Sequence, residues 1–145
     1  MYKHILIATD GSDLAGKAVN AGLQLAKVLN ANVTAVTVTE PWTAYITGEG
    51  PIAFPIDEYE NSAAENATRT LAAVGDLAKK LAVDCKSIHL KDQYPADGII
   101  DAAQSHACDL IVMASHGRRG LGRFLLGSAA LSVLTHSTVP VLICR

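Results

Sequence analysis

The segment His4-Ile-Leu-Ile-Ala8 runs directly into the polar turn Thr9-Asp10-Gly11-Ser12. A short apolar run that ends in turn residues is typical of a strand covered on both faces, as in a parallel sheet. Leu110-Ile-Val-Met-Ala114 repeats the pattern later in the chain. We therefore expect both segments to be buried strands of a parallel sheet.

Three further segments have strand character. Val33–Val38 is rich in β-branched residues, Val139–Ile143 is strongly apolar, and Lys86–Leu90 is a weaker candidate. Helical patterns separate all five segments, so strands and helices alternate along the chain. This alternation predicts an α/β protein with a parallel sheet and right-handed crossovers.

Four helices are expected between the strands. Two of them show apolar residues at helical spacing. The first, with Ser12 as its N-cap, has the stripe Leu14, Ala18, Gly22, Leu25 and Leu29; the second has the stripe Ala64, Ala67, Leu71, Val74, Ala78 and Leu81. Pro95 marks the start of the third helix, and Ser128–His136 supplies the fourth.

The composition indicates one folded domain over residues 1–145. Half of the residues are hydrophobic, 18% are charged and the net charge is −2. These values argue against disorder, general nucleic-acid binding and binding to anionic membranes, and no apolar run approaches the length of a membrane span. Because Cys85, Cys108 and Cys144 are odd in number and widely spaced, we expect reduced thiols in a cytoplasmic protein.

Two connections are longer than the roughly 2–6 residues usual in α/β units. Glu40–Tyr59 is aromatic and acidic, and Ser115–Gly127 contains glycines and arginines. Both should open at the carboxyl ends of strands, where open α/β sheets bind ligands.

The segment after the first predicted strand partly matches a phosphate-binding P-loop. Gly11-Ser-Asp-Leu-Ala-Gly-Lys-Ala18 matches GxxxxGK[ST] in all but its last position. Ala18 lacks the hydroxyl that would bind Mg²⁺, and Asp13 would place a negative charge inside the phosphate cradle. The segment is therefore interpreted as an ordinary strand-to-helix connection.

The glycine-rich segment Ser115–Ser128 is a stronger candidate for binding an anion. Glycines allow backbone N–H groups to approach a phosphate closely, and the amino end of the following helix carries partial positive charge. Composition alone fits a plain connection with solvated arginines about equally well. The histidines show no metal-ligand spacing, and no set of catalytic residues is evident.

Three motifs occur in order along the chain. They are Lys3-His-Ile-Leu-Ile-Ala-Thr-Asp-Gly-Ser12, then Met113-Ala-Ser-His-Gly117 followed after nine residues by Gly127-Ser128, and finally Thr138-Val-Pro-Val-Leu-Ile-Cys144. Together they resemble the universal stress protein family. The second resembles the family's ATP-binding signature, G-2x-G-9x-G-[S/T]. The resemblance covers essentially the whole chain. It implies a Rossmann-like domain with five parallel strands in the order 3-2-1-4-5 and four helices on both faces.

The resemblance also implies an adenine-nucleotide site, with ATP as the ligand, with or without Mg²⁺. Its expected residues are Ala8, Thr9, Asp10 and Val38 on the adenine and ribose side, Met113, Ala114 and Gly117 beside the nucleotide, and Gly127, Ser128 and Ala129 at the phosphates. Asp10 would accept hydrogen bonds from the ribose hydroxyls, or cap the first helix, or do both. Arg118 and Arg119 lie in the family's variable stretch, so no role is assigned to them.

Ala114 departs from the family signature, which has glycine there. A left-handed backbone or direct ligand contact at this position would make the extra methyl cost about 1–2 kcal/mol, whereas an extended backbone would accept alanine at no cost.

The function implied is that of a small cytoplasmic ATP-binding regulator or sensor in a stress response. It would act as a homodimer through the edge strand Val139–Ile143, where Pro140 is tolerable. No catalytic residues are assigned, and the expected activity is at most slow ATP hydrolysis or autophosphorylation. No nucleic-acid or membrane partner is expected. The alternative is a nucleotide-free dimeric interaction module of the same fold. A phosphoryl-accepting receiver domain using Asp10 is disfavoured, because the later strands lack the required acids and lysine.

Overall fold

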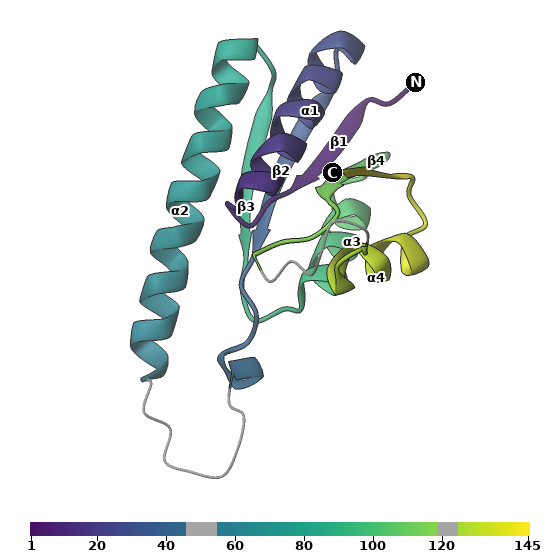
Figure 1. Cartoon of the computed structure of the whole chain (residues 1–145). Coiled ribbons are helices and arrows are strands. Elements are labelled where there is room, and N and C mark those ends of the chain that lie inside the picture. Colours follow the sequence, from purple (N-terminus) through teal and green to yellow (C-terminus); the bar gives the residue numbers. More distant parts are fainter. Residues whose placement is uncertain (46–54, 119–124) are drawn as a thin grey trace.

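The computed structural model describes residues 1–45, 55–118 and 125–145 and has strands and helices in alternation (Figure 1). Both long connections therefore lie partly outside the described residues. In chain order the elements are β1 (His4–Ala8), α1 (Asp13–Leu29), β2 (Asn32–Val38), the short 3₁₀ helix η1 (Trp42–Tyr45), α2 (Ile56–Leu81), β3 (Cys85–Leu90), α3 (Pro95–Ser105), β4 (Leu110–Ala114), α4 (Ser128–His136) and β5 (Val141–Cys144).

The five strands form one parallel sheet in the order β3-β2-β1-β4-β5. This confirms the expected α/β fold and strand order. In the centre of the sheet, Ile7 is paired with Ala35 of β2 on one side and with Val112 of β4 on the other. β1 and β4 are adjacent in the sheet although about a hundred residues separate them in the chain. Their carboxyl ends therefore form one shared edge.

The helices cover both faces of the sheet. α1 and α2 pack on the face that carries Ile5 and Ile7, while α3 and α4 pack on the face that carries Leu6 and Ile111 (Figure 1). The β1 and β4 side chains alternate between these two cores, and all residues from Ile5 to Ala8 and from Leu110 to Ala114 are buried. Burial on both faces explains why these strands are continuously apolar.

The face that α1 turns to the sheet includes Ala18 and Gly22 of the predicted stripe but differs from it elsewhere. Its buried residues are Ala15, Ala18, Val19, Gly22, Leu23 and Ala26, whereas Leu14, Leu25 and Leu29 are only partly buried. Close packing is the physical reason. A Cβ on Gly22 would lie 2.7 Å from Cδ1 of Ile7, so small residues bring the helix against the strand.

Two boundaries also differ from the sequence prediction. α2 begins at Ile56, before the predicted stripe, and no residue of it before Ala67 is buried. Its first half extends beyond the sheet (Figure 1). β5 begins at Val141 rather than Val139, because Pro140 precedes the strand and contributes only its carbonyl, which accepts from the Ile111 N–H.

The predicted caps are present where they can be checked. Ser12 Oγ accepts a hydrogen bond from the Ala15 N–H and caps α1, and Pro95 opens α3. None of the helices within the described ranges is both long and apolar enough to cross a membrane.

Candidate functional site

The carboxyl ends of β1 and β4 meet where the chain direction divides. After β1 the chain passes to α1 on one face of the sheet, and after β4 it passes to α4 on the other face (Figure 1). In open α/β sheets such a divergence creates a crevice beyond the strand ends, where ligands bind. All ten predicted site residues belong to this edge or to the neighbouring end of β2.

Four of the ten lie at or directly after the carboxyl ends of the two strands and are buried: Ala8, Thr9, Met113 and Ala114. The side chains of Ala8 and Met113 belong to the core under α3 and α4, and that of Ala114 belongs to the core under α1 and α2. Ala8, Met113 and Ala114 therefore have only backbone groups to offer at this edge, whereas Thr9 also has a hydroxyl, which accepts from the Gly11 N–H.

Ala114 is the last residue of β4 and is paired with Cys144 of β5. It is not among the described residues with a left-handed backbone. Because its backbone is extended, the methyl group introduces no conformational strain. Of the two alternatives for this position, the structure has the extended one.

Asp10 connects the β1–α1 turn to the long connection after β4. Its Oδ1 accepts from the Ser12 N–H at 2.9 Å, and its Oδ2 accepts from the Arg118 N–H at 2.9 Å. Gly11 between them has φ +79°, which favours glycine, and its N–H donates to Thr9 Oγ1. Since Ser12 caps α1, Asp10 organises the turn instead. A carboxylate has about four lone-pair sites, so Asp10 can accept further hydrogen bonds.

Two glycines of the connection after β4, Gly117 and Gly127, are required by close contacts. A Cβ on Gly117 would overlap Oδ2 of Asp10. A Cβ on Gly127 would lie 3.1 Å from Cα of His116, and the Gly127 N–H donates to the Ser115 carbonyl at 2.7 Å. The two ends of the connection are thereby fastened to each other beside Asp10.

α4 directs its amino end toward this edge. Gly127 is the N-cap, and the first intrahelical bond runs from the Leu131 N–H to its carbonyl. The preceding amides, including those of Ser128 and Ala129, have no acceptor within the helix, and glycine has no side chain to cap them. Ser128 is exposed, so its hydroxyl is accessible together with these amides. This is an arrangement suited to an anion.

Val38 lies at the end of β2, one strand further from β4. Its side chain points toward α3, where a Cβ on Gly98 would be 3.4 Å from Val38 Cγ1. Beside it, Thr39 Oγ1 and His89 Nε2 are hydrogen bonded at 2.6 Å. Burial, with a smaller effect from Lys91, lowers the pKa of His89.

A cleft of about 580 Å³ opens next to this edge, between α1 and α2. Gly11, Thr70 and Arg118 line this cleft together. The two side chains lie close to the Gly11 backbone, because a Cβ on Gly11 would be 3.2 Å from Arg118 Nη2 and 2.6 Å from Thr70 Oγ1. Sequence reasoning assigned no role to Arg118 or Thr70. The signals in the sequence were an arginine in a glycine-rich segment and a threonine next to Leu71 of the predicted helical stripe.

A second cleft, of about 460 Å³, lies along α3 and includes Asp92, Asp97 and Asp101. Within residues 1–45, 55–118 and 125–145, no three His, Cys, Asp or Glu side chains are grouped so that they could hold a metal ion.

Comparisons with known proteins agree with this architecture. The chain matches the universal stress protein family over residues 1–145. It is 33% identical to universal stress protein YxiE of Bacillus subtilis over 152 residues, covering 100% of both chains. The solved structure of universal stress protein UspA from Lactobacillus plantarum superimposes with a TM-score of 0.84 at 26% identity, covering 99% of this chain and 98% of that one.

A universal stress protein solved in complex with cAMP is also similar, with a TM-score of 0.74 at 26% identity, over 99% of this chain and 97% of that one. The full-length family match, the sequence relative and the shared strand order lead to one conclusion: the chain belongs to the universal stress protein family.

Proposed function

We propose that this protein binds an adenine nucleotide, ATP in particular, in the crevice between the ends of β1 and β4. The observation that carries the proposal is the convergence of the Asp10 carboxylate and the amino end of α4 at this edge. A similar universal stress protein has been solved with cAMP, which supports an adenine ligand for this chain as well.

The two ends of the crevice suit the two ends of a nucleotide. Asp10 can accept hydrogen bonds from the ribose hydroxyls. The free amides of Ser128 and Ala129, with the Ser128 hydroxyl, can donate to phosphate oxygens, which the helix dipole also attracts. Gly117 and Gly127 place no side chains of their own beside these groups, and a Cβ at either position would meet its neighbours.

The strand ends would hold the base. We propose that the backbone groups of Ala8, Thr9, Val38, Met113 and Ala114 form this wall, since the side chains of all but Val38 are buried. Mg²⁺ accompanying ATP would bind mainly phosphate oxygens and water, as this cation usually does.

We further propose a homodimer through the edge strand β5. β5 is paired only with β4, and Leu142 in it is 40% exposed. An apolar edge strand is a template for pairing with another strand, and a second copy offers the same edge across a two-fold axis.

In this proposal the protein is a cytoplasmic regulator or sensor of a stress response, whose state depends on the bound nucleotide. All three cysteines are free thiols, in keeping with a reducing compartment.

The proposal is tested by a cycle between protein and ligand. Calorimetric titration measures the binding of ATP, 2′-deoxy-ATP and 3′-deoxy-ATP to the native protein and to Asp10→Asn. If Asp10 binds the ribose, removing the contacted hydroxyl should weaken binding to the native protein about 10-fold, the effect of a hydrogen bond to a charged group. The same removal should cost little in Asp10→Asn.

Asp13→Asn is the matched control, because Asp13 is an exposed carboxylate in the first turn of α1. It should bind all three nucleotides as the native protein does. Equal losses in the native protein and Asp10→Asn would show that Asp10 does not contact the ribose. No ATP binding at millimolar concentration would leave a nucleotide-free interaction module as the better description.

A further inference from the structure

The cleft between α1 and α2 is a second concave surface, distinct from the nucleotide crevice. Of the ten residues assigned to the nucleotide, only Thr9 lines it. Its volume of about 580 Å³ is within the range of small-molecule sites, roughly 300–1,000 Å³. Because it opens on the face of the sheet under α1 and α2, α4 and its amino end do not contribute to it.

The charge of the cleft lining is positive. Arg69 and Arg118, both exposed, line the cleft, and its described lining contains no carboxylate. Asn66 Oδ1 accepts a hydrogen bond from Arg69 Nη2 at 2.6 Å on the exposed surface of α2. Thr70 Oγ1 and Arg118 Nη2 both lie close to the Gly11 backbone. Donors from α2 and from the connection after β4 therefore meet at the same end.

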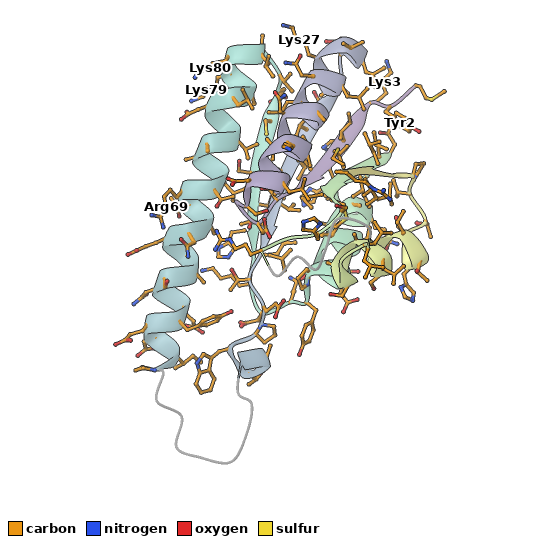
Figure 2. The ribbon with its side chains drawn as sticks, viewed as in Figure 1. Tyr2, Lys3, Lys27, Arg69, Lys79 and Lys80 are labelled. Atoms are coloured by element: carbon orange, nitrogen blue, oxygen red, sulfur yellow. The ribbon has the colours of Figure 1, made fainter. Side chains whose placement is uncertain are left out.

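The helix dipole does not account for the position of Arg69. Lys27 and Lys79 lie in the last turns of α1 and α2, where the helix dipole favours a cation (Figure 2). Arg69 lies in the middle of α2, where the dipole gives no such reason (Figure 2). Arg69 and Arg118 are both exposed and both line the cleft, so an anion in the cleft can pair with their guanidinium groups.

Apart from Thr9 and Ser12, the remainder of the lining is apolar and leaves open space. Val19 of α1 and Val74 of α2, both buried, contribute to it together with Ala73 and Leu77. A Cβ on Gly16 would have no neighbour within 4 Å, so the α1 wall is open at that point.

From this combination we propose that the cleft binds a small organic anion, whose phosphate or carboxylate group lies between Arg69 and Arg118. Its apolar body lies along Val19, Ala73 and Leu77. The shared chemistry is a compact anionic group joined to an apolar part. The site is separate from the nucleotide site and does not depend on nucleotide binding.

The test uses phenyl phosphate and benzoate as probes, titrated into the full-length ¹⁵N-labelled protein and followed by NMR. Inorganic phosphate supplies the anion alone, and phenol supplies the apolar part alone. At least one of the two combined probes should shift the amide signals of Gly11, Gly16 and Thr70, and should bind at least 10-fold more tightly than either partial probe. Which combined probe binds more tightly distinguishes a phosphate from a carboxylate.

Variants locate the binding. Gly16→Leu should fill the cleft and abolish the shifts, whereas Gly75→Leu, a glycine of α2 that also faces open space but does not line the cleft, should leave them unchanged. Arg69→Gln should weaken binding about 10-fold, and Arg69→Lys should restore part of it. Circular dichroism confirms that each variant is folded.

Three results would overturn the proposal. The first is the absence of shifts with both combined probes at millimolar concentration. The second is binding that survives Gly16→Leu, or shifts concentrated at Ser128, which would place the probes in the nucleotide crevice. The third is equal affinity for inorganic phosphate and the combined probes, which would remove any role for the apolar wall.

Discussion

Replacing Ala114 by glycine restores the residue that the family signature carries, and the structure predicts that this change is harmful. The methyl group is buried in the core under α1 and α2, on the last residue of β4. The backbone is extended there, so glycine relieves no strain. Ala114→Gly should therefore lower stability without improving nucleotide binding.

The magnitude follows from two contributions. Losing a buried methyl group costs about 0.8 kcal/mol, and glycine in a strand costs roughly 0.5–1 kcal/mol more through the entropy of the unfolded chain. The sum, about 1.5 kcal/mol, should lower the Tm by about 5 °C, because a domain of this size has an unfolding entropy near 0.3 kcal/mol/K. The Kd for ATP should change less than about twofold.

Scanning calorimetry measures the first quantity and isothermal titration the second. Ala35→Gly is the matched control: Ala35 is fully buried in the middle of β2, in the same core, and away from the strand ends. It should lower the Tm similarly and leave ATP binding unchanged. A roughly 5- to 30-fold gain of ATP affinity in Ala114→Gly alone would refute the reasoning, since it would mean that the methyl group obstructs the ligand.

Three other perturbations have defined outcomes. Gly127→Ala places a Cβ 3.1 Å from Cα of His116 and displaces the start of α4, so ATP titration should show roughly 5- to 10-fold weaker binding. Its control is Gly75→Ala, which has open space around it. This variant should bind ATP normally and unfold at a temperature about 2–4 °C higher. Leu142→Lys should convert a dimer into a monomer in light scattering at micromolar concentration, and a monomeric native protein would contradict the dimer itself. Burial, with a smaller effect from Asp109, raises the pKa of the Cys108 thiol from 9.0 to about 11, so the folded state keeps a proton that the unfolded chain loses. Denaturant titrations should therefore show the free energy of unfolding falling from pH 9 toward pH 11, and falling less steeply in Cys108→Ala. Equal slopes in the two proteins would count against this cause.

Much of the fold was predictable because local signals agreed with it. The apolar segments His4–Ala8 and Leu110–Ala114 are strands with those bounds, and Ser128–His136 is a helix with those bounds. The strand order, in contrast, came from the family resemblance, since periodicity does not determine which strands are neighbours. The start of α2 at Ile56 had local signals as well, namely Pro55 at the N-cap and acidic residues in the first turn.

The predictions were weaker wherever packing decided the outcome. The predicted α1 stripe is right at Ala18 and Gly22 but wrong at Leu14, Leu25 and Leu29, because the helix lies so close to Ile7 that its small residues face the sheet. The hydrogen bond from the Arg118 N–H to Asp10 joins residues 108 positions apart, and no local sequence pattern predicts it. The cleft between α1 and α2 depends on how two helices sit on the sheet, which periodicity leaves open.

The central claim, an adenine-nucleotide site at the ends of β1 and β4, is tested most directly by thermal unfolding of nucleotide-stripped protein with Mg-ATP and with Mg-GTP. A ligand at about 100 times its Kd adds roughly 2.7 kcal/mol to the stability of a folded protein. For 145 residues this corresponds to a Tm rise of roughly 5–10 °C. The Tm should rise with ATP and not with GTP. An unchanged Tm at millimolar ATP, or an equal rise with both nucleotides, would contradict it.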